Sequence, residues 1–303
     1  TQDAGADAYN VAVGYNAGIA VTTGIQNTIV GGLAGDSLTS GVNNVALGYQ
    51  SLTVATTSSF NVSIGTFSMG NNILAARNVG VGYNTLNQLN TGSATDTYNT
   101  AVGFSAGGTL TTGVQNTLIG GLAGDALTTG SHNVAIGVSA LSAEDGNGRN
   151  VAIGHSALAS QNAGADAYNV AIGYSAGGAV TTGVQNTIVG GDAGKAFTTG
   201  GFNVAIGYNA LSTEDAHGTN VAIGKSALQN LNAGANAYNV AVGFEAGLSV
   251  TTGVKNTIVG GIAGDAITTG LNNTLLGYNS GGALVGGSYN VALGYFALAN
   301  EDA

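Results

Sequence analysis

A five-residue phrase recurs through the whole chain and limits the folds that are open to it. The phrase reads Asn, Val or Thr, any residue, Val, Ile or Leu, and Gly, and it occurs seventeen times in 303 residues. Thirteen of the sixteen spacings between successive phrases equal seventeen, two equal nineteen and one, from Asn78 to Asn99, equals twenty-one. A fixed period of this length is typical of solenoids, in which each repeat packs only against its neighbours.

The coil types also repeat. Asn99, Asn169 and Asn239 each begin a block of three seventeen-residue coils and one slightly longer coil, and an extra coil lies near 61–77. We therefore predict a single solenoid array over residues 1–303. Because the sequence starts and stops in mid-repeat, we expect either a segment of a longer array or subunits that join end to end.

The phrase alternates as a β-strand does. Its second and fourth positions, for example Val170 and Ile172, are Val, Thr, Ile or Leu in every copy, which predicts that both face the core. Runs such as AVTTG at 179–183 predict a second strand in each coil. Stacking in register would then give an all-β, parallel β-solenoid of about seventeen 17-residue coils with two sheets. The absence of Pro agrees with this, since Pro would remove a ladder hydrogen bond.

Three further positions of the repeat also have structural interpretations, and each would form a column of side chains along the stacked coils. The Gly that closes each phrase predicts a turn with positive φ or a close backbone approach. The small residue three positions later predicts tight packing. The Asn column predicts a ladder of side-chain amides that hydrogen-bond between coils. The ladder positions include Asn10, Asn27, Asn44, Asn99, Asn116, Asn169, Asn186, Asn239 and Asn256.

The middle residue of the phrase points, on this interpretation, away from the core. It is Ala, Ile or Leu in fifteen of seventeen copies, and an apolar stripe of this length argues for burial against another chain. We therefore predict an inter-chain interface. Its residues include Ala12, Ile29, Ala101, Leu118, Ala171, Ile188, Ala205, Ala222 and Ile258.

Composition narrows the possible functions. Only 7% of the residues are charged, and 15 acidic residues against five basic ones leave no positive surface for a nucleic acid. The absence of Cys excludes disulfides and thiolate metal sites. No apolar run approaches the roughly 20 residues that a membrane-spanning helix needs, so we expect no membrane insertion in this segment.

Acidic pairs occupy equivalent turns. They are Glu144 with Asp145, Glu214 with Asp215, and Glu301 with Asp302. We favour solvated charge that keeps a Gly-rich chain soluble, and a weak Ca²⁺ site remains the alternative. Adjacent carboxylates diverge, and His132, His155 and His217 lie at three different coil positions, so we predict no catalytic or other metal site and no enzyme.

Sixteen of the nineteen aromatic residues fall in two columns, directly before the Asn and directly after the Gly of the phrase. Packing at the corners of the coils or between chains is one interpretation. Contact with a receptor or a sugar, through residues such as Tyr15, Tyr174 and Tyr208, is the other.

The segments NVAIGHSAL (150–158), NVAIGYSA (169–176) and NVAIGYNAL (203–211) resemble the head-domain repeats of the trimeric autotransporter adhesins, the YadA-like family. The longer AGDALTTGSHNVAIG (123–137) also resembles repeats of bacteriophage tail fibres. The resemblance implies a left-handed parallel β-roll in which three chains pack side by side. It supplies no catalytic residues.

Together these observations predict a structural, adhesive segment of an extracellular fibre, on a cell surface or a virion. Its partners would be two further copies of the chain and a cell-surface or matrix receptor. One alternative is the subunit of an extracellular filament that polymerises end to end. The other is an enzyme similar to the tailspikes, which degrades polysaccharide.

Overall fold

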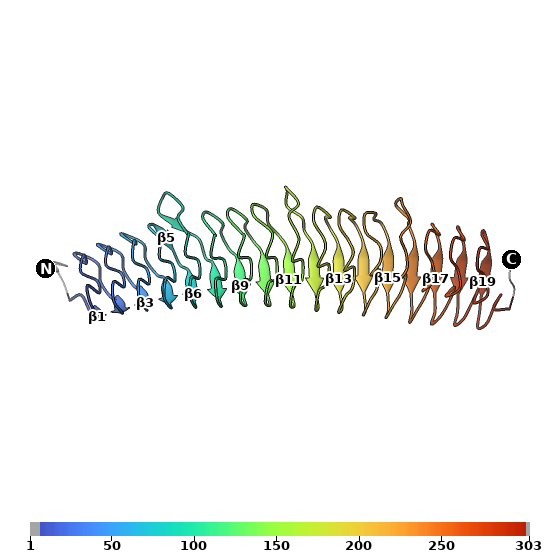
Figure 1. Cartoon of the computed structure of the whole chain (residues 1–303), viewed down its shortest axis with the longest axis horizontal. Helices are drawn as coiled ribbons and strands as arrows, with labels where there is room; N and C mark the ends of the chain where they lie inside the picture. Colours follow the sequence, from blue (N-terminus) through green and yellow to red (C-terminus); the bar gives the residue numbers. More distant parts are fainter. Residues whose placement is uncertain (1–6, 301–303) are drawn as a thin grey trace. The chain divides into compact units, whose positions relative to one another are not determined.

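The computed structural model describes residues 7–300, and this part of the chain is all β with no helix. As predicted, the fold is a parallel β-solenoid of about seventeen turns (Figure 1). The chain divides after Arg149 into two compact units, unit 1 and unit 2, each of which is a stack of coils. A helix long and apolar enough to cross a membrane does not occur among the described residues.

Each coil contributes one three-residue strand, which starts directly after the phrase Asn, and successive strands pair in parallel. In unit 1 the sheet runs β1 (Val11–Val13), β2 (Thr28–Val30), β3 (Val45–Leu47), β4 (Val62–Ile64), β6 (Val79–Val81), β8 (Thr100–Val102), β9 (Thr117–Ile119) and β10 (Val134–Ile136). In unit 2 it runs β11 (Val151–Ile153), β12 (Val170–Ile172), β13 (Thr187–Val189), β14 (Val204–Ile206), β15 (Val221–Ile223), β16 (Val240–Val242), β17 (Thr257–Val259), β18 (Thr274–Leu276) and β19 (Val291–Leu293).

The predicted second strand of each coil is wrong. Residues 179–183 form no strand, because the N–H groups of Thr181, Thr182 and Gly183 all donate to one acceptor, the carbonyl of Thr198, at 2.8, 3.2 and 3.1 Å. Three donors on one oxygen cannot make the evenly spaced bonds of a parallel ladder. Within residues 7–300 the second side of the coils forms a sheet at one place, where β5 (Ala75–Ala76) pairs with β7 (Thr95–Asp96).

The strands also face the opposite way from the prediction. In β12 the middle residue Ala171 is buried, whereas Val170 and Ile172, the predicted core pair, point outward and remain partly exposed. The reason is the preceding Asn169, whose side chain is buried inside the coil. Side chains alternate along a strand, so an inward Asn places the next residue outside and the middle residue inside.

The Asn ladder is confirmed, and its bonds are mainly to the backbone. Asn169 Oδ1 accepts from the N–H of Asn186 at 2.8 Å, and Asn169 Nδ2 donates to the carbonyl of Gly183 at 2.7 Å. Asn186 repeats both bonds, to the N–H of Asn203 and to Gly200. Amides also bond to one another in several coils, as Asn273 Nδ2 does to Asn256 Oδ1 at 3.0 Å. An Asn such as Asn169 or Asn186 therefore ties its coil to the next at two points.

The interpretations of the Gly column and of the small-residue column are confirmed as well. The Gly that closes the phrase has φ between +123° and +145° in all seventeen copies, a region that is essentially limited to Gly. A Cβ on Gly190 would lie 2.6 Å from the backbone of Gly207 in the next coil. The small residue three positions later is buried in every coil except the first and the last, at Ala17 and Ala297.

Replacing one ladder residue should destabilise the stack. In Asn186→Ala the N–H of Asn203 and the carbonyl of Gly200 lose their partners inside the coil. Each buried group left unsatisfied costs about 1–3 kcal/mol, so we expect a loss of about 2–6 kcal/mol. The matched control is Gln185→Ala, at the exposed neighbouring position. Urea unfolding followed by circular dichroism measures both variants, and equal midpoints would contradict this role for the ladder.

Two adjacent glycines offer a sharper comparison. Gly190→Ala forces a Cβ into the backbone of the next coil at positive φ, whereas a Cβ on Gly191 meets nothing closer than the Tyr208 ring at 3.5 Å. We expect Gly190→Ala to lose about 1–3 kcal/mol from backbone strain, and more from the collision. Gly191→Ala should unfold as the parent protein does. Similar thermal midpoints for the two variants would show that the turn tolerates a side chain.

Candidate functional site

The surface of each unit carries an apolar strip that we call the outer strand face, defined as the first and third residues of the seventeen main strands. Neither position is buried in any of these strands. Several residues are well exposed, among them Leu47, Ile119, Ile172 and Leu276. The outer strand face therefore presents Val, Thr, Ile and Leu side chains, one pair per coil.

The predicted interface residues lie elsewhere, and that prediction is wrong. Ala12 is exposed in β1, but the others fill the interior of their own coils, where no second chain can reach them. Those buried residues are Ile29, Ala101, Leu118, Ala171, Ile188, Ala205, Ala222 and Ile258. The error follows from the reversed phase of the strand, and it moves the candidate interface to the outer strand face.

Two aromatic columns border the outer strand face. All sixteen of their rings lie at the surface, with exposed fractions between 45% and 77%, and Tyr15, Tyr174 and Tyr208 are among them. Some rings stack along the column, as Tyr83 and Phe104 do at 5.4 Å between centroids. Within one chain these side chains therefore remain largely open to a partner, and the two interpretations of them both stay predictions.

Basic residues share these columns, which the count of charges alone did not reveal. Four of the five basic side chains occupy them: Arg77, Arg149, Lys225 and Lys255. Arg77 lies over the Phe60 ring at 4.6 Å and near the Tyr98 ring at 5.9 Å, and Lys225 lies over Phe244 at 5.0 Å. A cation over an aromatic face is a favourable contact, so the column positions suit both residue types.

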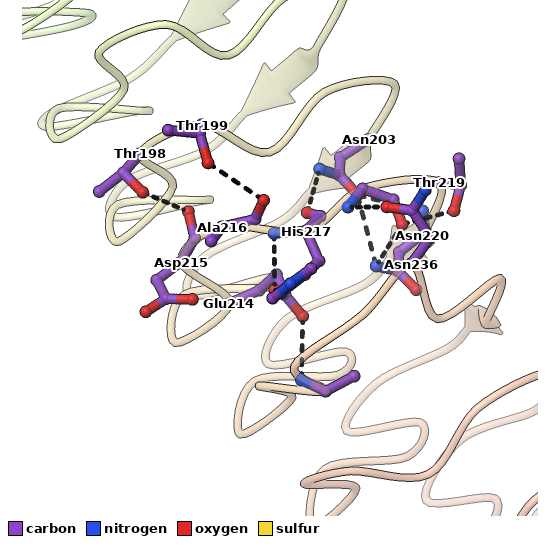
Figure 2. Close-up of polar contacts among 12 residues, drawn as sticks. Thr198, Thr199, Asn203, Glu214, Asp215, Ala216, His217, Thr219, Asn220 and Asn236 are labelled. Atoms are coloured by element: carbon purple, nitrogen blue, oxygen red, sulfur yellow. Dashed lines mark hydrogen bonds and ion pairs between the residues drawn. The ribbon is translucent and has the colours of Figure 1, made fainter.

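The acidic turn at Glu214 is built differently from the prediction. Glu214 is fully buried, and Figure 2 shows its carboxylate beneath His217. Glu214 Oε1 accepts from the backbone N–H of His217 at 3.1 Å, and Oε2 accepts from the N–H of Ala233 at 3.5 Å. The carbonyl of His217 in turn accepts from the ladder residue Asn203 at 3.2 Å. The carboxylate therefore braces the turn against the ladder.

Glu144 occupies the equivalent turn of unit 1 in the same way. It is fully buried, and its Oε1 accepts from the N–H of Asn147 at 3.1 Å. Asp145 and Asp215 point outward and are exposed. The prediction that these side chains are solvated charges is therefore correct for the two Asp residues and wrong for the two Glu residues. The pair Glu301 with Asp302 lies outside the described residues.

Burial raises the pKa of the Glu214 carboxyl above its ordinary value. Desolvation is the largest cause and the nearby Asp215 charge adds to it, while the N–H donors of His217 and Ala233 and the His217 side chain oppose it. Burial also raises the pKa values of Asp125 and Asp265, which occupy equivalent coil positions. Burial in the folded state therefore favours the protonated form of each of these three carboxyl groups.

The Glu214 turn offers one combination of metal-binding groups. Ligand atoms of Glu214, Asp215 and His217 lie within 4.8 Å of one another. Two carboxylates and an imidazole suit a transition metal better than Ca²⁺, which takes six to eight oxygens. His155 stacks on Tyr174 at 5.4 Å and stands apart from this turn, as does His132. The predicted weak Ca²⁺ site at Glu144, Asp145, Glu214 and Asp215 stays a prediction.

Comparisons with known proteins found no relative of this chain. No family model, no curated protein and no solved structure matches this chain.

The raised pKa of Glu214 predicts a pH dependence of stability. Between the ordinary glutamate pKa of 4.5 and the raised folded value, the folded chain binds more protons than the unfolded chain, so the free energy of unfolding falls as pH rises. Glu214→Gln removes this titratable group, so the free energy of unfolding should decrease less steeply as pH rises. Asp215→Asn removes only the smallest cause of the raised pKa and leaves Glu214 buried, so it should keep most of this pH dependence. Urea unfolding between pH 4 and 6 measures both, and parallel slopes for the two variants would contradict the assignment.

Proposed function

We propose that this chain is a structural, adhesive segment of an extracellular fibre in which three copies associate through their outer strand faces. The observation that carries the proposal is the outer strand face itself. In all seventeen main strands, two apolar or Thr side chains per coil stay uncovered within a single chain. A continuous exposed apolar surface is typical of an interaction site.

Further copies of this chain are the occupant that fits best. Parallel strands repeat every 4.7–4.9 Å or so, and a second copy repeats Val or Thr and Val, Ile or Leu at the same step. Two such faces can therefore match coil by coil, whereas a partner without this period would match at few places. No charged residue occupies the face in any of the seventeen strands. The proposed number of copies, three, is taken from the resemblance to the YadA-like adhesins.

The interior of the coils suits a mechanical role. Each described ladder Asn between the ends of its unit bonds to the coil on either side, and the closing Gly residues between those ends sit against the next backbone. Such a stack resists bending and local opening because every coil depends on its neighbours. The proposed work of the segment is therefore to give length and stiffness to a surface that attaches.

A charge on the outer strand face should separate the copies. Ile172 is 38% exposed, so Ile172→Glu leaves the coil interior intact but places a carboxylate in the proposed contact. Light scattering after size exclusion should give a three-chain mass for the parent and a single-chain mass for the variant. Thr182→Glu, at an exposed turn of the same coil, is the control and should keep the parent mass.

An unchanged mass in Ile172→Glu would refute the interface. A parent mass that climbs with protein concentration would favour the alternative, in which subunits join end to end into a filament. Adding Ca²⁺ and then a chelator in the same measurement tests whether the predicted weak calcium site supports association.

A further inference from the structure

Unit 1 contains a cavity of about 510 Å³, wide open to solvent, at the point where the repeat is most irregular. The coil between Asn78 and Asn99 is the longest in the array, and Figure 1 shows the chain beside β5 looping farther from the main strands than its neighbours do. Small-ligand sites typically measure about 300–1,000 Å³. The lining includes Thr57, Ser58, Phe60, Ala76, Thr95 and Asp96.

The coils beside the cavity lack the Gly that most coils have before the ladder Asn. Three residues before the ladder Asn, most coils have Gly, and a Cβ there would collide with the next coil. At Gly41 and Gly113 it would lie 2.2 Å from a backbone oxygen. Here the same position holds Ser58 and Ala75, so side chains are admitted, and the β5–β7 pair forms one wall.

One residue beside the cavity has a buried hydroxyl group without a hydrogen-bond partner. Ser58 is only 2% exposed, and its Oγ makes no hydrogen bond to any residue in the described range 7–300. A buried hydroxyl without a partner costs free energy. The Ser58 Oγ is closed to solvent, so a molecule in the cavity would meet the hydroxyl of the exposed lining residue Thr57 instead.

The rim combines an aromatic ring with a fixed carboxylate. The Phe60 ring is 45% exposed, and the Arg77 guanidinium lies over it. Arg77 Nε in turn donates to Asp96 Oδ2 at 2.8 Å, and the Tyr98 hydroxyl donates to the same oxygen at 3.3 Å. The pKa of Arg77 is raised by this hydrogen bond. Asp96 is thereby held in place, with its side chain 47% exposed.

We infer that this cavity binds a neutral sugar residue of a glycan. A sugar ring has apolar C–H faces that pack on an aromatic side chain and hydroxyls that donate to a carboxylate and exchange hydrogen bonds with Ser and Thr. Phe60, Asp96 and Thr57 supply these three kinds of contact. The pairing of Arg77 with Asp96 leaves no net positive charge, and the chain carries a net charge of −10, so an anionic ligand is disfavoured.

The inference rests on the proposed adhesive function and gives it a ligand class, although the cavity and the outer strand face are tested separately. Saturation-transfer NMR on the full chain would use glucose, galactose, mannose, N-acetylglucosamine and N-acetylgalactosamine as neutral probes. Glucuronic acid and inorganic phosphate would serve as anionic probes. We expect transfer to at least one neutral sugar and a weaker signal with the anions.

Two variants locate the site. Phe60→Ala should lower the affinity for that sugar at least tenfold, and Thr57→Ala should also weaken it. Phe202→Ala is the matched control, because Phe202 is an exposed residue of the same column where position 200 keeps its Gly. It should leave binding unchanged. No transfer to any neutral sugar, binding of anions alone, or equal loss in Phe60→Ala and Phe202→Ala would overturn the inference.

Light scattering on the same samples separates this inference from the proposed association. Phe60→Ala should keep the parent mass while it loses the sugar. If the parent protein is a single chain that still binds the sugar through Phe60, the association is wrong and the sugar site stands. A three-chain protein that binds no sugar gives the reverse result.

Discussion

The rest of this structure depends on the inward-facing Asn side chain that begins each strand. Its oxygen accepts the N–H of the next Asn and its amide donates to a turn carbonyl of the next coil, as in Asn186. Both partners belong to the backbone, so the bonds hold only if coils are stacked at one spacing and in one register. The close approach of consecutive Gly residues, such as Gly190 to Gly207, requires that same spacing.

The inward Asn also decides what the surface looks like. Alternation puts the Val or Thr and the Val, Ile or Leu of the strand outside, and it puts Ala or one larger aliphatic residue inside a narrow interior. The aromatic and basic residues border the outer strand face, and the acidic residues lie mainly in the turns. Glu144 and Glu214 are the exceptions, because their carboxylates accept backbone N–H groups inside the coil.

The period, the parallel register, the Asn ladder and the Gly turns could all be predicted from the sequence, because each recurs at a fixed position. The facing of the strands could not be read from hydropathy, since Val170, Ala171 and Ile172 are all apolar. Asn169 held the missing signal, because its amide needs backbone partners that only the interior provides. The burial of Glu214 and the absence of a second strand at 179–183 depend on turn geometry, which the repeat does not encode.

Coils with and without Gly before the Asn differ in the side chains that they can present. Nine of the seventeen coils have Gly three residues before the Asn, and at Gly41 and Gly113 a Cβ would collide with the next coil, so these coils give a repeating surface and little chemical variety. The other coils carry a side chain at that position, as at Ser58 and Ala75, and also at Asn147 and His217. A specific ligand site needs several unlike side chains around one volume. In such a chain it is expected at a departure from the period, and the coils around β5 and β7 meet that condition.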